Sequence, residues 1–178
     1  MRQDYLYLID YTRVFALACA RAPRLDLMEP FAELAHATIQ TEMELHRDYA
    51  EEWGISREEL EAEEPGPTTR AYSNFLLRAA TLGDFGELVA ALLSCMWGYS
   101  ELGRRLDQGP RPPDERCARW IDTYAGEEFA ALADWCRGVC DDIAAEAGAT
   151  GRERMQEAFV TSSRYELEFW DAAWRSVA

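Results

Sequence analysis

The sequence has few basic residues. Its 178 residues include 18 Lys and Arg against 33 Asp and Glu, which gives a formal net charge of −15. A nucleic-acid-binding protein neutralises phosphates with a basic face, and an anionic membrane surface attracts basic clusters. The acidic balance therefore argues against both of these partners. A neutral or cationic small molecule is a better match to the negative electrostatic field of this chain.

Long apolar runs are also missing. The longest nearly apolar stretch runs from Leu88 to Met96 and is interrupted by Ser94, whereas a membrane-spanning helix needs about 20 apolar residues. The first five residues contain no apolar core of a signal peptide. The cysteines are odd in number, five, and form no CxxC pair, so we expect reduced thiols in a cytoplasmic protein.

Histidine is scarce, which bears on metals. The chain has only His36 and His46, and both fall in the same predicted helix. Glu33 and His36 match the Glu-x-x-His spacing of di-iron bundles, but a full site repeats that motif on a second helix. The predicted first helix has no histidine that could ligate haem. We therefore expect neither a metal nor another cofactor, and a di-iron or redox protein is the weakest of the alternatives.

What the sequence does have is helical periodicity. Apolar residues recur at helical spacing, and the expected helices span about 2–21, 26–53, 68–82, 84–106, 120–124, 127–147 and 150–174, with one short turn at 56–60. Expected N-caps are Asp26, Thr68 or Thr69, Asp84 and Thr150. No segment has the alternating pattern of a strand, and no repeat is visible. The sequence predicts an all-α, single-domain helix bundle over 1–178.

Polar and aromatic residues recur on helix faces that should point inward. Asp4 and Tyr7 are three residues apart, as are Glu166 and Phe169, so each pair shares a helix face. A pocket built from such residues suits a flat, nitrogen-rich heterocycle, because rings stack on aromatic faces and ring amines pair with carboxylates. The candidate site residues are Asp4, Tyr7, Tyr72, Cys95, Tyr99, Tyr124, Glu166 and Phe169.

Five motifs, in order along the chain, resemble those of the TenA/thiaminase II family. They read QDYLYL at 3–8, AYSNFLLR at 71–78, AALLSCMWGY at 90–99, WIDTY at 120–124 and SSRYELEFW at 162–170. Each motif alone is weak, but the set is specific and extends over essentially the whole chain. The third motif carries the cysteine of the cysteine-bearing branch, and Ser94 replaces the proline usual before it.

The resemblance implies a haem-oxygenase-like helical fold without haem, assembled as a homotetramer. It implies a hydrolase that releases hydroxymethyl-pyrimidine from aminomethyl-pyrimidine, and more poorly from thiamin. Cys95 would be the nucleophile that adds to the ring, and Glu166 would protonate a ring nitrogen. Asp4 would hold the exocyclic amine near the thiol. The other candidates would form hydrogen bonds (Tyr7 and Tyr124) or stack on the ring and line its box (Tyr72, Tyr99 and Phe169).

Two alternatives remain open at this point. The first motif of this chain lies at its start, whereas family members reach it after about one more helix. We therefore expect either an upstream start or a bundle that lacks its first helix. A non-catalytic aminopyrimidine-binding or regulatory protein would keep the aromatic box without turnover. Residue by residue, Cys95 could also be an inert buried thiol, Glu166 a solvated carboxylate and the aromatic residues ordinary core.

Overall fold

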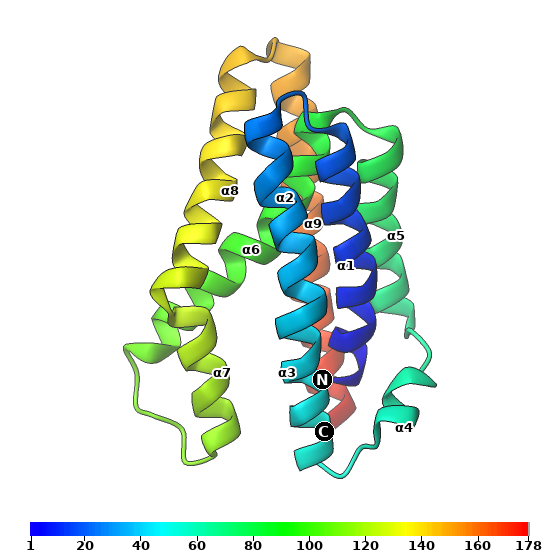
Figure 1. The fold of residues 1–178 in the computed structure, drawn as a ribbon, viewed down its shortest axis with the longest axis vertical. Coiled ribbons are helices and arrows are strands. Elements are labelled where there is room, and N and C mark those ends of the chain that lie inside the picture. Colours follow the sequence, from blue (N-terminus) through cyan, green and yellow to red (C-terminus); the bar gives the residue numbers. More distant parts are fainter. Residues whose placement is uncertain (178) are drawn as a thin grey trace.

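The computed structural model describes residues 1–177, and within them it contains helices and no strand (Figure 1). The all-α prediction is confirmed. The elements are α1 (Arg2–Arg21), α2 (Leu25–Ala37), the π-helical turn η1 (Thr38–Glu42), α3 (Met43–Glu52), α4 (Arg57–Glu61), α5 (Pro67–Leu82), α6 (Phe85–Asp107), α7 (Glu115–Ala125), α8 (Glu127–Glu146) and α9 (Ala149–Val177).

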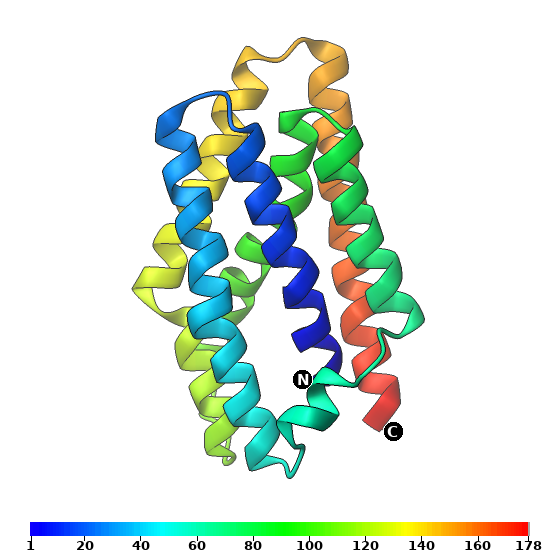
Figure 2. The ribbon, with the colours of Figure 1, turned by 45° about the vertical axis from the view of Figure 1, so that its right-hand side comes forward.

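Two groups of helices form the bundle. Helix α6 packs against α7, α8 and α9, and α1 packs against α2 and α5. Contacts of α5 with α9, and of α1 with α6, join the two groups. Figure 2 shows α1 running between the α2–α3 rod and α5, with both chain ends at the same end of the bundle as α4. The candidate motifs on α1, α5, α6 and α9 are thereby brought to one interior.

That interior is a continuous apolar core. Its fully buried members include Phe15, Phe31, Leu76, Leu88 and Leu92, each at most 1% exposed. Burial of one such side chain stabilises the fold by about 1.5–3 kcal/mol. Because α6 supplies a nearly unbroken buried run, from Leu88 to Ser94, it serves as the central helix and fixes the position of Cys95.

One predicted helix start, at Asp84, is confirmed as a capping box, and a second box that was not predicted precedes α4. Asp84 Oδ1 accepts from the backbone N–H of Glu87, and Glu87 Oε2 accepts from the N–H of Asp84, both at 2.9 Å. Ser56 and Glu59 make the same reciprocal pair before α4. Gly54 ends the preceding helix with φ of +75°, the left-handed conformation that glycine adopts without a steric penalty.

Three predicted N-caps are wrong. Helix α2 begins one residue before Asp26, whose carboxylate pairs with Arg24 instead. Helix α5 begins at Pro67, ahead of both threonines, because proline lacks an N–H and the first helical position needs none. Thr150 lies inside the first turn of α9. In each case the helix starts one to two residues earlier than the polar side chain suggested.

The predicted helix at 26–53 contains an irregular turn. At Thr38–Glu42 the chain forms a π-helical turn, in which the N–H of Met43 donates to the carbonyl of Thr38, five residues back. A π turn holds one more residue than an α turn, so it rotates the following helix about its axis. Glu42, the last residue of this turn, and His46, four residues later, face the interior of the bundle.

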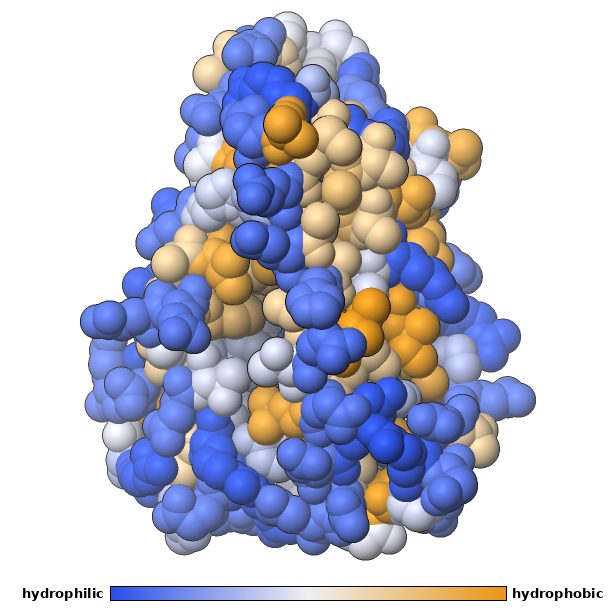
Figure 3. Space-filling model, viewed as in Figure 1, coloured by the Kyte–Doolittle hydropathy of each residue, from blue (hydrophilic) through white to orange (hydrophobic). Residues whose placement is uncertain are grey.

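The outer surface is mixed. In Figure 3, hydrophilic residues cover the end of the molecule near α3 and α7, and apolar side chains gather over the middle of the face where α1 and α2 run. Among the described residues, no helix combines the length and apolar character needed to cross a bilayer. Glu33 and His36 are both exposed on α2.

Candidate active site

A stack of aromatic rings forms the centre of the site. The ring of Tyr7 on α1 stacks on Tyr72 of α5 and on Tyr11, with centroids 5.0 and 5.2 Å apart. Phe169 of α9 lies at an angle to Tyr7, with centroids 6.0 Å apart. The structure therefore brings Tyr7, Tyr72 and Phe169 together from three helices that are distant in sequence.

Glu166 on α9 is anchored to this stack. The hydroxyl of Tyr72 donates to Oε1 of Glu166 at 2.7 Å and lies 3.1 Å from the hydroxyl of Ser162. Ser162 in turn donates to the backbone carbonyl of Ala91 at 2.7 Å, which ties α9 to α6. Burial raises the pKa of Glu166 to about 7, against the opposing effect of the Tyr72 hydrogen bond. Near neutral pH this carboxyl can therefore donate or accept a proton.

Cys95 on α6 faces the same cluster. Burial raises the pKa of its thiol well above the ordinary value, and the charge of Glu166 adds to the effect, while the Tyr7 hydroxyl opposes it. The Tyr7 hydroxyl is buried and makes no hydrogen bond of standard geometry within the described residues. Cys95 is thus a protonated, half-buried thiol at neutral pH, close enough to Glu166 for the two groups to influence each other's protonation.

Asp4 has a partner that the sequence did not suggest. Its Oδ2 lies 2.8 Å from Nε2 of His46 on α3, and Nδ1 of the same ring lies 2.8 Å from the backbone oxygen of Glu42. Burial alone would raise the pKa of Asp4, but the charge and hydrogen bond of His46 outweigh it and leave that pKa below its ordinary value. Asp4 is therefore an ionised carboxylate at the edge of the aromatic cluster.

Tyr124 on α7 directs its hydroxyl to another carboxyl. It donates to Oε1 of Glu42 at 2.9 Å, and its ring lies 5.1 Å from that of Tyr99. Gly103 makes this position possible, because a Cβ at Gly103 would lie 2.6 Å from the carbonyl carbon of Tyr124. Burial raises the pKa of Glu42, whose carboxyl adds a second acid beside Asp4.

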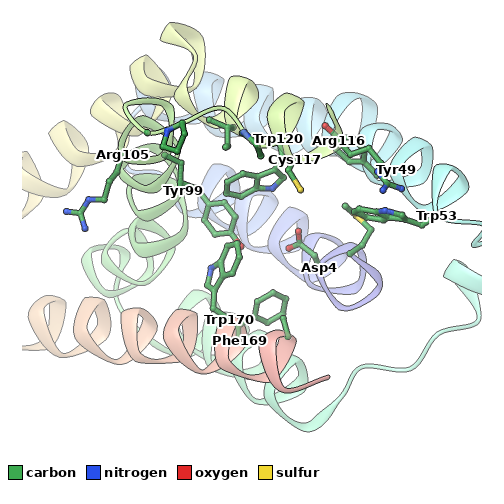
Figure 4. A pocket seen from close by; sticks show the side chains of 17 residues that line it. Asp4, Tyr49, Trp53, Tyr99, Arg105, Arg116, Cys117, Trp120, Phe169 and Trp170 are labelled. Atoms are coloured by element: carbon green, nitrogen blue, oxygen red, sulfur yellow. The ribbon is translucent and has the colours of Figure 1, made fainter. Parts of the chain in front are cut away.

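An open cavity of about 600 Å³ leads to these residues from the end of the bundle. Figure 4 shows Asp4, Tyr99, Phe169 and Trp170 around one part of it and Tyr49, Trp53 and Arg116 around another. Cys95, Tyr72 and Glu166 do not line this cavity, and Glu166 instead borders a smaller pocket of about 340 Å³ with Ser163 and Gly98. The open cavity therefore reaches Asp4, Tyr99 and Phe169 of the candidate site but not the thiol of Cys95.

The family model described as TENA/THI-4/PQQC matches residues 1–176. This chain belongs to the TENA/THI-4/PQQC family. It is 45% identical over 175 residues to an aminopyrimidine aminohydrolase of Halalkalibacterium halodurans, covering 98% of this chain and 78% of that protein. It is 36% identical to the aminopyrimidine aminohydrolase of Bacillus subtilis, covering 97% and 73% of the two chains.

Solved structures of family members share the fold. A TenA family transcription regulator from Silicibacter sp. TM1040 superposes with a TM-score of 0.87 at 32% identity, over 96% of this chain and 78% of the other. A TenA homologue from P. horikoshii OT3 gives 0.86 at 30% identity, over 98% and 80%. The predicted haem-oxygenase-like helical fold is confirmed by these neighbours.

Sequence reasoning missed two ionisable residues of this family member's site, His46 and Glu42. A signal was present, since they are four residues apart and one of them is among only two histidines in the chain. Their direction was not visible, however, because the π turn that points them inward has no sequence signature comparable to a capping box. Asp4 reaches its partner only through tertiary packing of α1 on the α2–α3 rod.

Proposed function

We propose that this chain releases 4-amino-5-hydroxymethyl-2-methylpyrimidine from 4-amino-5-aminomethyl-2-methylpyrimidine, and weakly from thiamin, as a hydrolase of thiamin salvage. Two relatives named aminopyrimidine aminohydrolase support this class of reaction. The observation that carries the proposal is the meeting of a thiol and a carboxyl of pKa about 7 beside stacked tyrosines. Such a set provides a nucleophile, an acid and a surface for a planar ring.

The aminopyrimidine ring would be held by stacking and by one carboxylate. Tyr7, Tyr72, Tyr99 and Phe169 present aromatic faces from four helices, and stacking favours a flat heterocycle. Ionised Asp4 offers an acceptor to the exocyclic amine. Tyr124 donates a hydrogen bond to Glu42 and so holds the carboxyl group that lies beside Asp4.

Glu166 would start the chemistry. Near pH 7 about half of this group is protonated, since its pKa is about 7. Transfer of its proton to a ring nitrogen makes the ring electrophilic, and the sulfur of Cys95 then forms a bond to a ring carbon. The thiol is protonated at rest, so its proton passes to one of the surrounding carboxylates as the sulfur–carbon bond forms.

Departure of the amine completes the first half of the reaction. The amine leaves with a proton as ammonia, and water adds to the exocyclic carbon and loses a proton to the site. The sulfur–carbon bond then breaks, the ring recovers its aromaticity and Cys95 is restored as a thiol. Dividing one substitution into an addition and an elimination is the usual advantage of covalent catalysis.

Two substitutions test this assignment. Cys95→Ser and Glu166→Gln should each reduce the release of hydroxymethyl-pyrimidine from aminomethyl-pyrimidine by about 10²-fold or more, because each removes one reacting group. The product is followed by chromatography, and circular dichroism checks the fold. Cys140→Ser, a half-buried thiol on α8, is the matched control. Turnover by Cys95→Ser near the wild-type rate would contradict the proposal.

A non-catalytic role is the second candidate. The Silicibacter neighbour is described as a transcription regulator, so ligand binding without turnover is a real alternative in this fold. The two functions separate in one assay. A regulator would show a ligand-dependent rise in melting temperature with no hydroxymethyl-pyrimidine formed, whereas the hydrolase forms product.

The organisation of the protein in the cell completes the proposal. Residues 1–178 would act as one domain, the protein would be cytoplasmic, and four copies would form a homotetramer. The described residues include five cysteines, all of them free thiols, which is consistent with a reducing compartment. Light scattering in solution tests the tetramer.

A further inference from the structure

His46 is an ionisable side chain that the proposed reaction does not use. It is 1% exposed and lies between two hydrogen-bond partners on opposite sides of its ring. One partner is the backbone oxygen of Glu42 and the other is the carboxylate of Asp4, each at 2.8 Å. These two contacts fix the orientation of the buried imidazole, and they also indicate which of its ring nitrogens carry a proton.

The two contacts determine where the protons are. A carbonyl oxygen only accepts hydrogen bonds, so Nδ1 must carry a proton. In a neutral ring Nε2 would then be an acceptor, and it would face the acceptor oxygen of Asp4 at 2.8 Å. One further proton must therefore lie between Nε2 and Oδ2. The pair is either an imidazolium with a carboxylate or a neutral imidazole with a carboxylic acid.

Electrostatics favours the charged form. Burial lowers the pKa of His46, but the charge and hydrogen bond of Asp4, together with the charge and the backbone hydrogen bond of Glu42, outweigh burial and hold the pKa above its ordinary 6.5. The pKa of Asp4 is shifted the other way, below 3.8. Both directions place the shared proton on the histidine.

We propose that His46 is a positioning residue: as an imidazolium it binds one oxygen of Asp4 and leaves the other as an ionised acceptor for the exocyclic amine of the aminopyrimidine. This inference rests on the proposed function. Oδ1 of Asp4 makes no hydrogen bond within the described part of the chain, and Asp4 lines the open cavity (Figure 4). An ionised acid can accept on both oxygens, whereas a protonated acid cannot.

The surrounding charges explain why a cation is needed here. Glu42 of η1 faces His46, and the groups that influence Asp4 or are influenced by it are Tyr99 and Cys95 of α6, Tyr124 of α7, Glu166 of α9 and the amino group of Met1. Apart from that amino group, all of these are acids or neutral. Without the imidazolium, Asp4 and Glu42 would repel each other as two half-buried carboxylates, and the pKa of Asp4 would rise.

Nuclear magnetic resonance of histidine labelled with ¹⁵N tests the proton count directly. The chain has only two histidines, and exposed His36 is an internal reference whose signals the variant His36→Gln assigns. At about pH 7.5 we expect both ring nitrogens of His46 to be protonated. A neutral His46 at that pH would overturn the inference. This measurement needs no turnover, so its failure is distinct from failure of the proposed hydrolase.

The pH profile of turnover tests the positioning role. In His46→Gln we expect the acid limb of kcat/KM to move up by about 1–3 pH units, because Asp4 has lost its neighbouring cation. His36→Gln should keep the wild-type profile, and Asp4→Asn should remove the effect of changing His46. An equal loss in His46→Gln at every pH would indicate a merely structural role and overturn the proposal. If His46→Gln does not fold, the ¹⁵N measurement on the wild-type protein decides.

Discussion

At the scale of single residues, the site depends on opposite shifts in two carboxyl groups. Glu166 is half-buried beside neutral phenols, and its pKa rises to about 7. Asp4 is also half-buried, but its neighbour is the His46 imidazole, and its pKa falls. One acid is thus available to donate a proton at neutral pH, and the other is available to accept a hydrogen bond. Two carboxyls with different neighbours take two roles.

The raised pKa of Glu166 predicts a pH-dependent stability. Its folded pKa lies above the ordinary 4.5, so its contribution to stability is fully present below pH 4.5 and is lost as the pH rises through about 7. The variant Glu166→Gln does not titrate there. We therefore expect its melting temperature relative to wild type to increase from about pH 5 to pH 8, by several degrees, since 1 kcal/mol corresponds to about 2–4 °C for a chain of this size. A difference that stays constant with pH would contradict the raised pKa.

Some residues of the candidate site could be predicted from the sequence and others could not, because their contacts depend on tertiary packing. Cys95, Glu166, Tyr7 and Tyr72 could be proposed from motif and helix spacing, and the structure brings them together. The partner of Asp4 could not be proposed, because it depends on how α1 packs against a helix more than 40 residues away. The roles of these residues stay predictions until the substitutions are measured.

At the scale of helices, irregularity matters as much as regularity. The capping box at Asp84 could be predicted because two polar side chains at fixed spacing satisfy free N–H groups. The box at Ser56 has the same spacing but was not predicted. The π turn at Thr38–Glu42 was not legible, since its sequence TIQTE has no comparable signal. Yet this turn directs Glu42 and His46 inward, and π turns are often found at functional sites.

The corrected helix starts give an element-scale prediction. Asp84→Ala removes a true cap and should destabilise the protein by about 1–2 kcal/mol, seen as a lower melting temperature. Asp26→Ala is the matched control, because Asp26 lies inside the first turn of α2 and caps nothing. Thermal unfolding followed by circular dichroism compares the two. An equal loss in both variants would mean that the start of α2 is wrongly placed.

At the scale of the molecule, the fold follows from helices that share one core. Apolar stripes and the absence of strand patterns were enough to predict the bundle, and residues 1–177 bear this out. Periodicity could not predict which helices are neighbours in the bundle, because it shows which face of a helix is apolar but not which other helix covers that face. The single-domain organisation, the tetramer and the cytoplasmic location stay predictions.

The whole account depends on where the substrate ring lies. A crystal structure of Cys95→Ser with aminomethyl-pyrimidine tests this most directly, because Tyr99 and Phe169 line the open cavity whereas Cys95 does not. We expect the ring to stack in the tyrosine cluster, with a ring carbon about 3–3.5 Å from the side chain at position 95 and a ring nitrogen in hydrogen-bond reach of Glu166. A ring bound instead among Tyr49, Trp53 and Arg116, away from position 95, would contradict the proposed mechanism.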